Sequence, residues 1–452
     1  MDRSPERLST GVAGLDEILR GGLIPRRTYL VRGAPGTGKT ILGLHFLSAG
    51  EDALFVSLSE PESMVRAAAD ALTIDLAGVT FLDLTPDAGF FAESQTYDIF
   101  SPAEVERGPT TEAIVKRVCD LQPKRVFIDA INQLRYLTKD DQEFRRHIFS
   151  LLRFLREQGA TVLFTSESGA QFHDDDLQFV SDGVIQLERA EHRRQISVLK
   201  LRGSGFHEGF HALSITGEGL NVYPRLIPDI HTREFVPEAI SSGVPDLDAL
   251  LHGGLERGTV TLITGPIGVG KTTVGLHFLE EAARRGERSA VYLFEESVAT
   301  VVHRCESIGI PVERMLEDAH LSLVPVEPLQ LTPEAFASRV REEVEGRQAR
   351  IVMLDSVAGY RLAVQGDELV TRLHALTRYL RNMGVTVVLV NETETIAGPL
   401  RATDYGFSYL ADNVLFMRYL EIRGRLHKAI GVLKKRASDF EKTLRELEIT
   451  SE

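Results

Sequence analysis

The sequence predicts an α/β protein made of two tandem copies of one domain, each with a mainly parallel sheet flanked by helices. The first observation is an internal repeat: residues 9–23 read STGVAGLDEILRGGL and residues 241–255 read SSGVPDLDALLHGGL, with nine of fifteen positions identical. The same offset of 232 residues relates GAPGTGKT at 33–40 to GPIGVGKT at 265–272. The second observation is that short, near-continuous apolar runs alternate with helical patterns in both copies, which is typical of strands buried on both faces.

Each copy follows the same order of expected elements, beginning with a strand, a glycine-rich loop and a helix. The expected strands are residues 28–33, 53–58, 125–130 and 160–167 in the first copy, and 260–265, 290–295, 351–356 and 385–392 in the second. Helical patterns at 40–50 and 272–286 follow the glycine-rich loops. The stretch 221–238 is rich in proline and lacks helical periodicity, so we expect the domain boundary there, with domains at 1–228 and 229–452.

Composition and charge narrow the classes of function. The chain has 452 residues, 43% of them hydrophobic, and a formal net charge of −14, so we expect a globular protein that binds neither nucleic acid nor a membrane surface. There is no run of about 18 apolar residues and no apolar stretch at the N-terminus, so we expect neither a transmembrane helix nor a signal peptide. The two cysteines, Cys119 and Cys305, are far apart, which argues against a disulfide framework or a zinc ribbon and favours a reducing, cytoplasmic location.

Both glycine-rich segments match the P-loop pattern G-x-x-x-x-G-K-[ST], and both follow an expected strand and open an expected helix. In such a loop the glycines let backbone N–H groups surround a phosphate, and the helix N-terminus adds positive potential. We expect the phosphates of ATP to be held by Gly33, Gly36, Thr37, Gly38, Lys39 and Thr40 in the first copy, and by Gly265, Gly268, Val269, Gly270, Lys271, Thr272 and Thr273 in the second.

A nucleotide held in this way needs Mg²⁺, and the metal needs an acidic ligand at the tip of a neighbouring strand. Asp129 and Asp355 each end a buried apolar run downstream of a P-loop. The hydroxyls of Thr40 and Thr272 are the partners that a P-loop supplies to the same ion. We therefore expect one aspartate and one threonine in each copy to hold Mg²⁺.

Hydrolysis also needs a carboxylate that orients or deprotonates the attacking water. In the second copy, Glu295 and Glu296 follow the strand after the P-loop helix, whereas the first copy has Ser59 and Glu60 in the same place. Adjacent residues on an extended segment point in opposite directions, so only one member of each pair can face the phosphate. The candidate catalytic carboxylates are thus Glu295, Glu296 and Glu60. The serine predicts unequal copies, with most turnover in the second.

The lead-in TGxxxLDxxLxGGL, the P-loop, the glutamate pair and a late K-x-R together resemble the KaiC circadian-clock ATPase family of the RecA superfamily, over essentially all of the chain. The resemblance implies two RecA-like P-loop domains that stack into a double-ringed hexamer, with Mg-ATP bound between subunits. It also implies that the K-x-R of one subunit reaches the γ-phosphate held by its neighbour, as an arginine finger in trans. The residues at those positions are Lys200, Arg202, Lys434 and Arg436. A signalling partner of the KaiB-like kind is implied as well.

One segment departs from the family pattern. Clock members of the family phosphorylate themselves on an adjacent serine–threonine pair near the end of the second domain. Matching YLEIRG at 419–424 places Ser408 and Tyr409 at that pair, and Thr403 at an upstream threonine. Because tyrosine replaces the main acceptor, the resemblance supports the fold and the ATPase activity better than it supports autokinase activity or a clock role.

Three classes of function agree with these features. The first is a ring-forming ATP hydrolase, with serine/threonine autokinase activity and a signalling or circadian role as further options. The second is a nucleotide-sensing scaffold that binds ATP to assemble but turns over little; the turnover of Lys271→Ala against the wild type separates these two. The third is a RecA- or RadA-like DNA-dependent ATPase, which is disfavoured because Asp140, Asp141 and Glu143 lie among the basic residues that follow Asp129.

Overall fold

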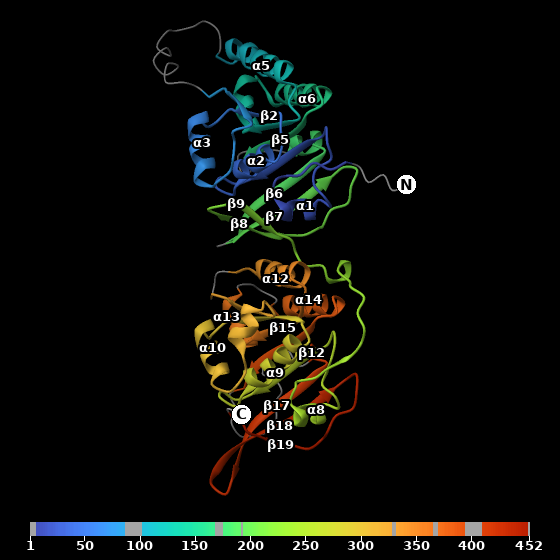
Figure 1. Cartoon of the computed structure of the whole chain (residues 1–452). Helices are drawn as coiled ribbons and strands as arrows, with labels where there is room; N and C mark the ends of the chain where they lie inside the picture. Colours follow the sequence, from blue (N-terminus) through green and yellow to red (C-terminus); the bar gives the residue numbers. More distant parts are fainter. Residues whose placement is uncertain are drawn as a thin grey trace. The chain divides into compact units, whose positions relative to one another are not determined.

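The chain divides into two compact units, Met1–Arg225 and Leu226–Glu452, and each is described by itself. The structure is a computed structural model, and it describes residues 6–85, 102–167, 175–190, 193–327, 331–364, 369–393 and 409–450. Each unit contains one large sheet with helices on both faces (Figure 1), so the predicted α/β class is confirmed. In the part of the chain that the structure describes, no helix is long and apolar enough to cross a membrane.

The first sheet has a parallel part and an antiparallel part. Its strands, in spatial order, are β3 (Val79–Asp83), β2 (Ala53–Ser57), β4 (Arg125–Asp129), β5 (Thr161–Glu167), β1 (Thr28–Gly33), β6 (Gly183–Ala190), β7 (Arg193–Leu201), β8 (His211–Thr216) and β9 (Gly219–Tyr223). The pairings from β3 to β6 are parallel, and those from β6 to β9 are antiparallel.

The second sheet repeats this order. Its strands, in the same spatial sequence, are β14 (Leu321–Pro325), β13 (Arg288–Leu293), β15 (Ala349–Asp355), β16 (Thr386–Glu392), β12 (Val260–Gly265), β17 (Asn413–Ile422), β18 (Arg425–Lys435) and β19 (Arg445–Leu447). A short ribbon of β10 (Ala239–Ile240) and β11 (Leu255–Glu256) lies outside the sheet. The repeat seen in the sequence is therefore a repeat of topology, with β1, β4 and β5 corresponding to β12, β15 and β16.

Helices cover both faces of each sheet. In the first unit they are α1 (Ala13–Ile18), α2 (Lys39–Ser48), α3 (Glu62–Ala71), α5 (Pro102–Leu121), η1 (Ile131–Leu137), α6 (Asp141–Glu157) and α7 (Asp175–Val180). In the second they are η2 (Pro228–Ile230), α8 (Pro245–Leu250), α9 (Lys271–Arg284), α10 (Val298–Glu306), α11 (Val312–Glu317), α12 (Pro333–Arg341), η3 (Glu342–Gly346), α13 (Val357–Ala363) and α14 (Leu369–Asn382).

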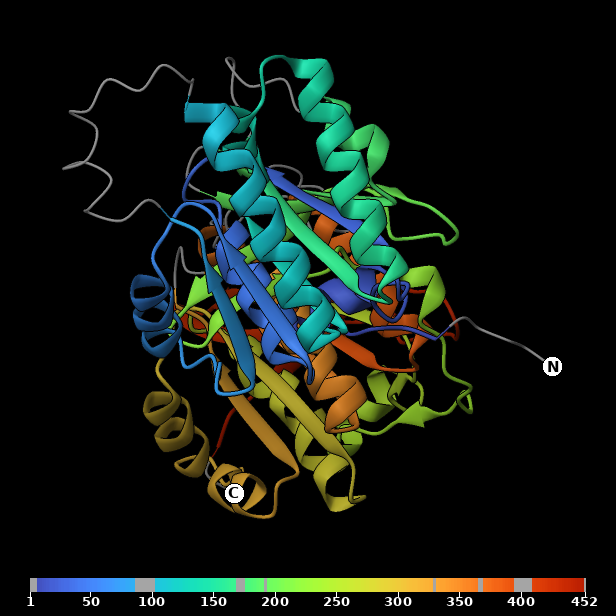
Figure 2. The ribbon, with the colours of Figure 1, turned by 90° about the horizontal axis from the view of Figure 1, so that it is seen from above.

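Alternation along the strands divides each core into two layers. In the first unit, one layer contains Val31, Phe55 and Phe127 with the helices α1, α2 and α3. The other contains Val56 and Ile128 with α5, η1 and α6, and Figure 2 shows α5 and α6 running across the same face of the sheet. Successive side chains of a strand point to opposite faces, so strands that are apolar throughout need helices on both sides.

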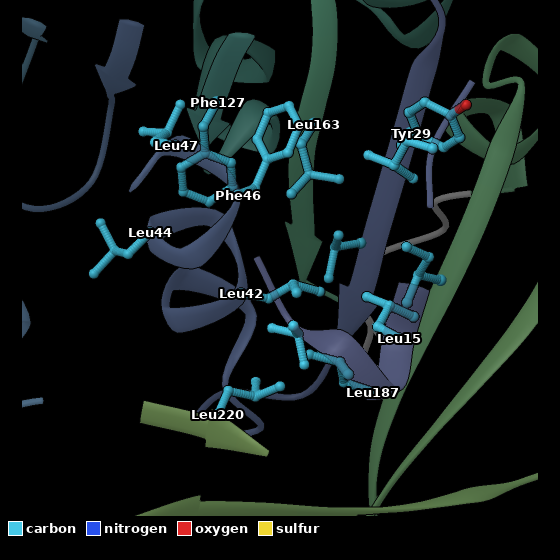
Figure 3. Close-up of a cluster of buried hydrophobic side chains, with 14 of the residues drawn as sticks. Leu15, Tyr29, Leu42, Leu44, Phe46, Leu47, Phe127, Leu163, Leu187 and Leu220 are labelled. Carbon is cyan, nitrogen blue, oxygen red and sulfur yellow. The ribbon is translucent and has the colours of Figure 1, made fainter. Parts of the chain in front are cut away.

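The helix after each P-loop lies close to the sheet because a glycine faces a large side chain. A Cβ added to Gly43 of α2 would lie 2.1 Å from the ring of Phe127, and one added to Gly275 of α9 would lie 2.9 Å from Met353. This contact explains why a glycine recurs at this position in both copies. Figure 3 shows the resulting layer in the first unit, with Phe46 and Leu47 of α2 near Phe127 of β4 and Leu163 of β5.

The strands expected from the sequence are all present, with ends that differ by at most two residues. The antiparallel parts of the sheets were not placed by the sequence analysis. The stretch 221–238, in which the boundary was expected, begins inside the edge strand β9, whose last residue is Tyr223. An edge strand needs partners on one side only, so its sequence is less apolar and harder to recognise.

Candidate functional site

The P-loops lie at the carboxyl ends of the parallel strands. The first P-loop follows β1, and β5 lies between β1 and β4 in the sheet. After β1 the chain crosses over β5 and β4 and forms β2 on the far side of β4. In a parallel sheet, the reversal of strand order opens a crevice at the carboxyl edge, where ligands bind. The second unit has the same arrangement of β12, β16 and β15.

The glycines of each P-loop have backbone conformations that other residues rarely adopt. Their φ angles are 73° at Gly36, 106° at Gly38, 75° at Gly268 and 111° at Gly270. These left-handed conformations turn successive N–H groups toward the centre of the loop. The helices α2 and α9 begin at the lysine that follows the last glycine of each loop. Both loops therefore have the geometry of a phosphate cradle at a helix N-terminus.

The residue just before the last glycine of the P-loop differs between the copies. In the first copy the Thr37 hydroxyl donates a hydrogen bond to the carbonyl of Ala34 at 2.8 Å, which closes the loop on itself. The second copy has Val269 there, fully buried in the apolar layer beneath the loop. Neither side chain is free to contact a ligand, so at this position the contribution to phosphate binding comes from the backbone.

In both copies the threonine that ends the P-loop contacts the aspartate at the tip of the neighbouring strand. The hydroxyl of Thr40 lies 2.6 Å from Asp129 Oδ2, and that of Thr272 lies 2.8 Å from Asp355 Oδ2. Two neighbouring oxygen ligands of octahedral Mg²⁺, each about 2.1 Å from the ion, are about 3 Å apart. The oxygens therefore already have the spacing of two Mg²⁺ ligands, and the residues present fit the metal that the P-loop pattern implies.

The two P-loop lysines are held inside their loops by carbonyl groups. Lys39 Nζ donates to the carbonyls of Gly33 and Ala34 at 2.8 and 3.1 Å, and Lys271 Nζ donates to that of Pro266 at 2.9 Å. Burial lowers the pKa of both lysines, and nearby carboxylates oppose that effect. A phosphate in the cradle would give each buried ammonium group an anionic partner in addition to these carbonyl groups.

A cavity of about 380 Å³ lies over the second P-loop, and the two glutamates enter it differently. Glu295 Oε1 accepts a hydrogen bond of 2.9 Å from the hydroxyl of Ser356. Glu296 instead forms an ion pair of 2.6 Å with Arg304. The neighbouring carboxylates therefore have different partners: a neutral hydroxyl for Glu295 and a guanidinium for Glu296.

The first copy lacks this arrangement. The Ser59 hydroxyl is 3.4 Å from the backbone carbonyl of Asp129. Glu60 is exposed, and its backbone carbonyl, not its carboxylate, accepts a hydrogen bond from Ser57. The residue after Asp129 is Ala130, where the second copy has a serine. At this position the first copy offers a hydroxyl in place of a carboxylate.

The basic residues of the first K-x-R lie at the opposite edge of the sheet from the P-loop of the same unit. Lys200 pairs with Val184, which pairs with Leu30 of β1. The P-loop begins at Gly33, three residues further along β1, which is about 10 Å away. Arg202 lies beyond Lys200, past the end of β7, and therefore further still from that P-loop.

The second K-x-R has the same placement. Lys434 pairs with Val414, which pairs with Leu262, again three residues before the P-loop strand ends. Arg436 lies 3.5 Å from Asp412, which precedes β17. Partial burial lowers the pKa of Lys434, and the charge of the neighbouring Arg436 adds to this effect.

Other residues at the second site were not singled out from the sequence. Glu392 lies 3.7 Å from Lys271, Arg304 pairs with Glu296, and Lys428 and Ile449 line the cavity. Glu392 could have been found, because the strands expected at 160–167 and 385–392 both end in glutamate. Lys428 could not, because it reaches the cavity through the register of the antiparallel strands.

The hydroxyl acceptors considered for autophosphorylation, Thr403 and Ser408, lie outside the described residues. The structure does describe Tyr409, which is exposed and has its ring 6.3 Å from that of His374.

Comparison with known proteins gives one consistent family. The family model described as "ATPase: KaiC" matches the chain twice, over residues 8–227 and 240–452. The circadian clock oscillator protein KaiC of Picosynechococcus sp. is 31% identical over 464 residues, covering 98% of this chain and 88% of that protein. The protein of the same name from Prochlorococcus marinus is 30% identical over 466 residues, covering 99% and 91%. That from Synechococcus elongatus is 28% identical over 467 residues, covering 98% and 88%.

Proposed function

The chain belongs to the KaiC ATPase family, and from this premise we propose that it is a ring-forming ATPase that binds Mg-ATP between neighbouring copies. In this proposal, each subunit supplies a P-loop and a metal-binding pair on one side of an interface. Its neighbour supplies the K-x-R from the other side. The second domain performs most of the hydrolysis, and the first domain holds ATP mainly to stabilise the assembly.

One observation carries the proposal: in each unit the phosphate cradle and the K-x-R lie at opposite edges of the same sheet. Lys200 and Lys434 are level with the third residue of the P-loop strand, and each arginine lies beyond its lysine toward the start of that strand, whereas the cradle follows its end. A phosphate bound in one cradle is thus out of reach of the K-x-R of the same unit. A second copy that presents its K-x-R edge to the cradle edge completes the site, and such a head-to-tail contact closes into a ring.

The partners of the two glutamates support their division of labour. Glu296 is neutralised by Arg304, whereas Glu295 accepts from a neutral hydroxyl and is not paired with a cation in the described contacts. A general base must remain available to accept a proton from water. We therefore assign the attacking water to Glu295 and give Glu296 a structural role. Ser59, at the corresponding position of the first copy, cannot accept that proton at neutral pH.

Mg²⁺, when bound with ATP, neutralises phosphate charge and orients the γ-phosphate. Thr272 and Asp355 would hold it in the second domain, and Thr40 and Asp129 in the first. Their side chains also tie the P-loop to the strand that carries the aspartate. Lys271, which lines the same cavity, would contact the phosphates.

The first expected result concerns assembly. Replacing both Lys39 and Lys271 by alanine should shift the protein from rings to monomers in Mg-ATP, because nucleotide that binds only the assembled form stabilises it by mass action. Native mass spectrometry with and without Mg-ATP measures the shift. The exposed Lys124, paired with Asp52 away from both sites, provides the control Lys124→Ala, which should assemble normally. A wild-type chain that stays monomeric at saturating Mg-ATP contradicts the proposal.

The second expected result concerns pH. Burial, with a smaller contribution from the charge of Glu296, raises the pKa of Asp355 to about 6 in the nucleotide-free protein. The carboxylate form binds Mg²⁺, so the metal affinity of the second site should be full above this pKa. It should fall by about tenfold for each pH unit below it. Because the folded, nucleotide-free protein binds this proton more tightly than the unfolded chain does, protonation of Asp355 adds to the free energy of unfolding at low pH. That contribution is lost as the pH rises through about 6.

Titration of Mg²⁺ dependence between pH 5 and 8, with Mg²⁺-dependent nucleotide binding as the readout, tests this second result. The amide of Asp355→Asn does not titrate, so that variant should bind Mg²⁺ weakly at every pH and lose the inflection. An inflection that persists in Asp355→Asn shows that another group is responsible.

A signalling role through a KaiB-like or other protein partner, autokinase activity and a place in a circadian clock are finer parts of the same proposal. The names of the curated relatives support the clock role, since they are circadian clock oscillator proteins. Incubation with Mg-ATP followed by mapping of phosphosites over 403–409 decides on the autokinase activity. Without phosphate there, the function proposed is ATP hydrolysis alone.

A further inference from the structure

We propose that Ser356 is a positioning residue that fixes the carboxylate of Glu295 for catalysis, and that its absence from the first copy adds to the inequality of the two domains. The inference rests on the proposed role of Glu295 in activating water. It concerns a residue that contacts neither the phosphate cradle nor the metal-binding pair through any described hydrogen bond, and that acts only through the glutamate.

The Ser356 hydroxyl makes two hydrogen bonds of opposite direction. It donates to Glu295 Oε1 at 2.9 Å, and it accepts from the backbone N–H of Gly359 at 3.0 Å. A serine hydroxyl has one proton to donate, so the bond from Gly359 forces that proton toward the glutamate. Ser356 is itself buried, with 4% of its surface exposed, so water does not compete for its hydroxyl.

Glu295 is exposed, but the backbone that faces its bonded oxygen is closely packed. A Cβ added to Gly359 would lie 3.1 Å from Glu295 Oε1 and 2.4 Å from Cβ of Phe294. The first turn of α13 therefore meets the glutamate with a hydroxyl on one side and a bare backbone on the other. One oxygen of Glu295 is held by this turn, which leaves the other oxygen as the acceptor for water. Catalysis depends steeply on such placement, because a displacement of about 1 Å can cost 10²-fold.

The first copy differs at every one of these positions. By strand register, Ser57 lies opposite Asp129 as Leu293 lies opposite Asp355, so Ser59 corresponds to Glu295. The residue after the aspartate is Ala130, which has no hydroxyl, and the position of Gly359 is occupied by Gln133. The segment there is the 3-10 helix η1, whose first residue has no side-chain cap. The copy that lacks the base thus also lacks the group that would hold it.

Ser356 also caps α13, and a purely structural role must be separated from positioning. Glycine is nearly as favourable as serine at an N-cap but has no hydroxyl, so it brings neither a donor nor a new charge to the site. Ser356→Gly therefore keeps most of the stability of the helix start and removes the bond to Glu295, Ser356→Ala removes both, and Ser356→Thr keeps both. Thr332 caps α12 by the same kind of bond to Ala335, away from the site, so Thr332→Ala controls for the loss of a cap alone.

The test is steady-state ATP hydrolysis by the full-length chain, with nucleotide affinity and assembly measured on the same samples. We expect Ser356→Ala and Ser356→Gly to lower kcat by about tenfold or more with KM for ATP within twofold, and Ser356→Thr and Thr332→Ala to remain near wild type. Combined with Glu295→Gln, Ser356→Ala should cause no further loss, because two residues that act as one unit are not additive.

Two results overturn the inference: wild-type kcat in Ser356→Gly, or a full additional loss when Ser356→Ala is combined with Glu295→Gln. The second of these assigns the serine to the fold of α13. A different result, wild-type kcat in Glu295→Gln alone, contradicts the proposed role of Glu295 itself. The experiment therefore distinguishes failure of the positioning role from failure of the function on which it rests.

Discussion

Replacement of Glu295 by glutamine is expected to lower the kcat of ATP hydrolysis by about 10²–10⁴-fold, the usual contribution of a positioned base. Glutamine has nearly the same shape but cannot accept the proton of the attacking water. Binding of ATP depends on the P-loop and the metal-binding pair and should therefore change little. Phosphate release under saturating Mg-ATP, together with nucleotide affinity, measures both quantities.

Two variants provide the contrast for this result. Ser59→Ala should leave turnover close to wild type, because the first copy has no carboxylate at that position to lose. Glu296→Gln removes the ion pair with Arg304 but leaves the bond between Glu295 and Ser356, so its effect should be much smaller than that of Glu295→Gln. The assignment of turnover to the second domain is wrong if Lys39→Ala abolishes hydrolysis in rings that remain intact.

Replacement of Arg436 by alanine is expected to reduce turnover by about 10³-fold or more, the range seen for arginine fingers that stabilise charge on a transferred phosphoryl group. Within its own unit, Arg436 lies near Asp412 at the edge of the sheet away from the P-loop. Asp412 is buried, but it also lies 3.6 Å from Arg381 and accepts a hydrogen bond from the Val260 N–H, so the loss of its contact with Arg436 should have only a small effect on the fold. A large loss of kcat therefore identifies a contact that forms only between subunits.

The matched control for this variant is Arg425→Ala, an exposed arginine at the other end of the same strand β18. It removes the same charge from the start of β18, whereas Arg436 directly follows the end of that strand, and it should leave kcat close to wild type. Equal losses in both variants would assign the effect to the stability of β18. A kcat of Arg436→Ala close to wild type would remove the K-x-R from the mechanism.

Much of the fold follows from local features of the sequence. Near-continuous apolar runs ending in aspartate or glycine identify the parallel strands, and the repeated glycines, with positive φ in the structure, identify both phosphate cradles. These features are local, because each strand or loop carries its own pattern. The contact between Thr40 and Asp129 could also be predicted from the sequence, because a P-loop Mg²⁺ site uses a threonine hydroxyl and an aspartate at the end of a neighbouring strand.

The parts that could not be predicted depend on register between distant segments. Ser356 meets Glu295 because Leu293 pairs with Asp355 across β13 and β15, and no local pattern fixes that register. Likewise, Lys428 reaches the second cavity only through the pairing of β18 with β19. The antiparallel β17–β18 pair contains a register shift after Val414, which changes the position of everything beyond it. Contacts of this kind can be identified only when the pairing of the strands in the folded sheet is known.

The central claim, that the catalytic site is completed between two copies, is tested most directly by mixing two inactive variants. Glu295→Gln and Arg436→Ala subunits are combined in equal amounts without nucleotide, assembled with Mg-ATP, and assayed for phosphate release. Random assembly places an intact Glu295 opposite an intact Arg436 at one interface in four, so turnover should recover to about a quarter of wild type. Activity no greater than the average of the two separate variants would mean that each site is complete within one chain, and would contradict the account.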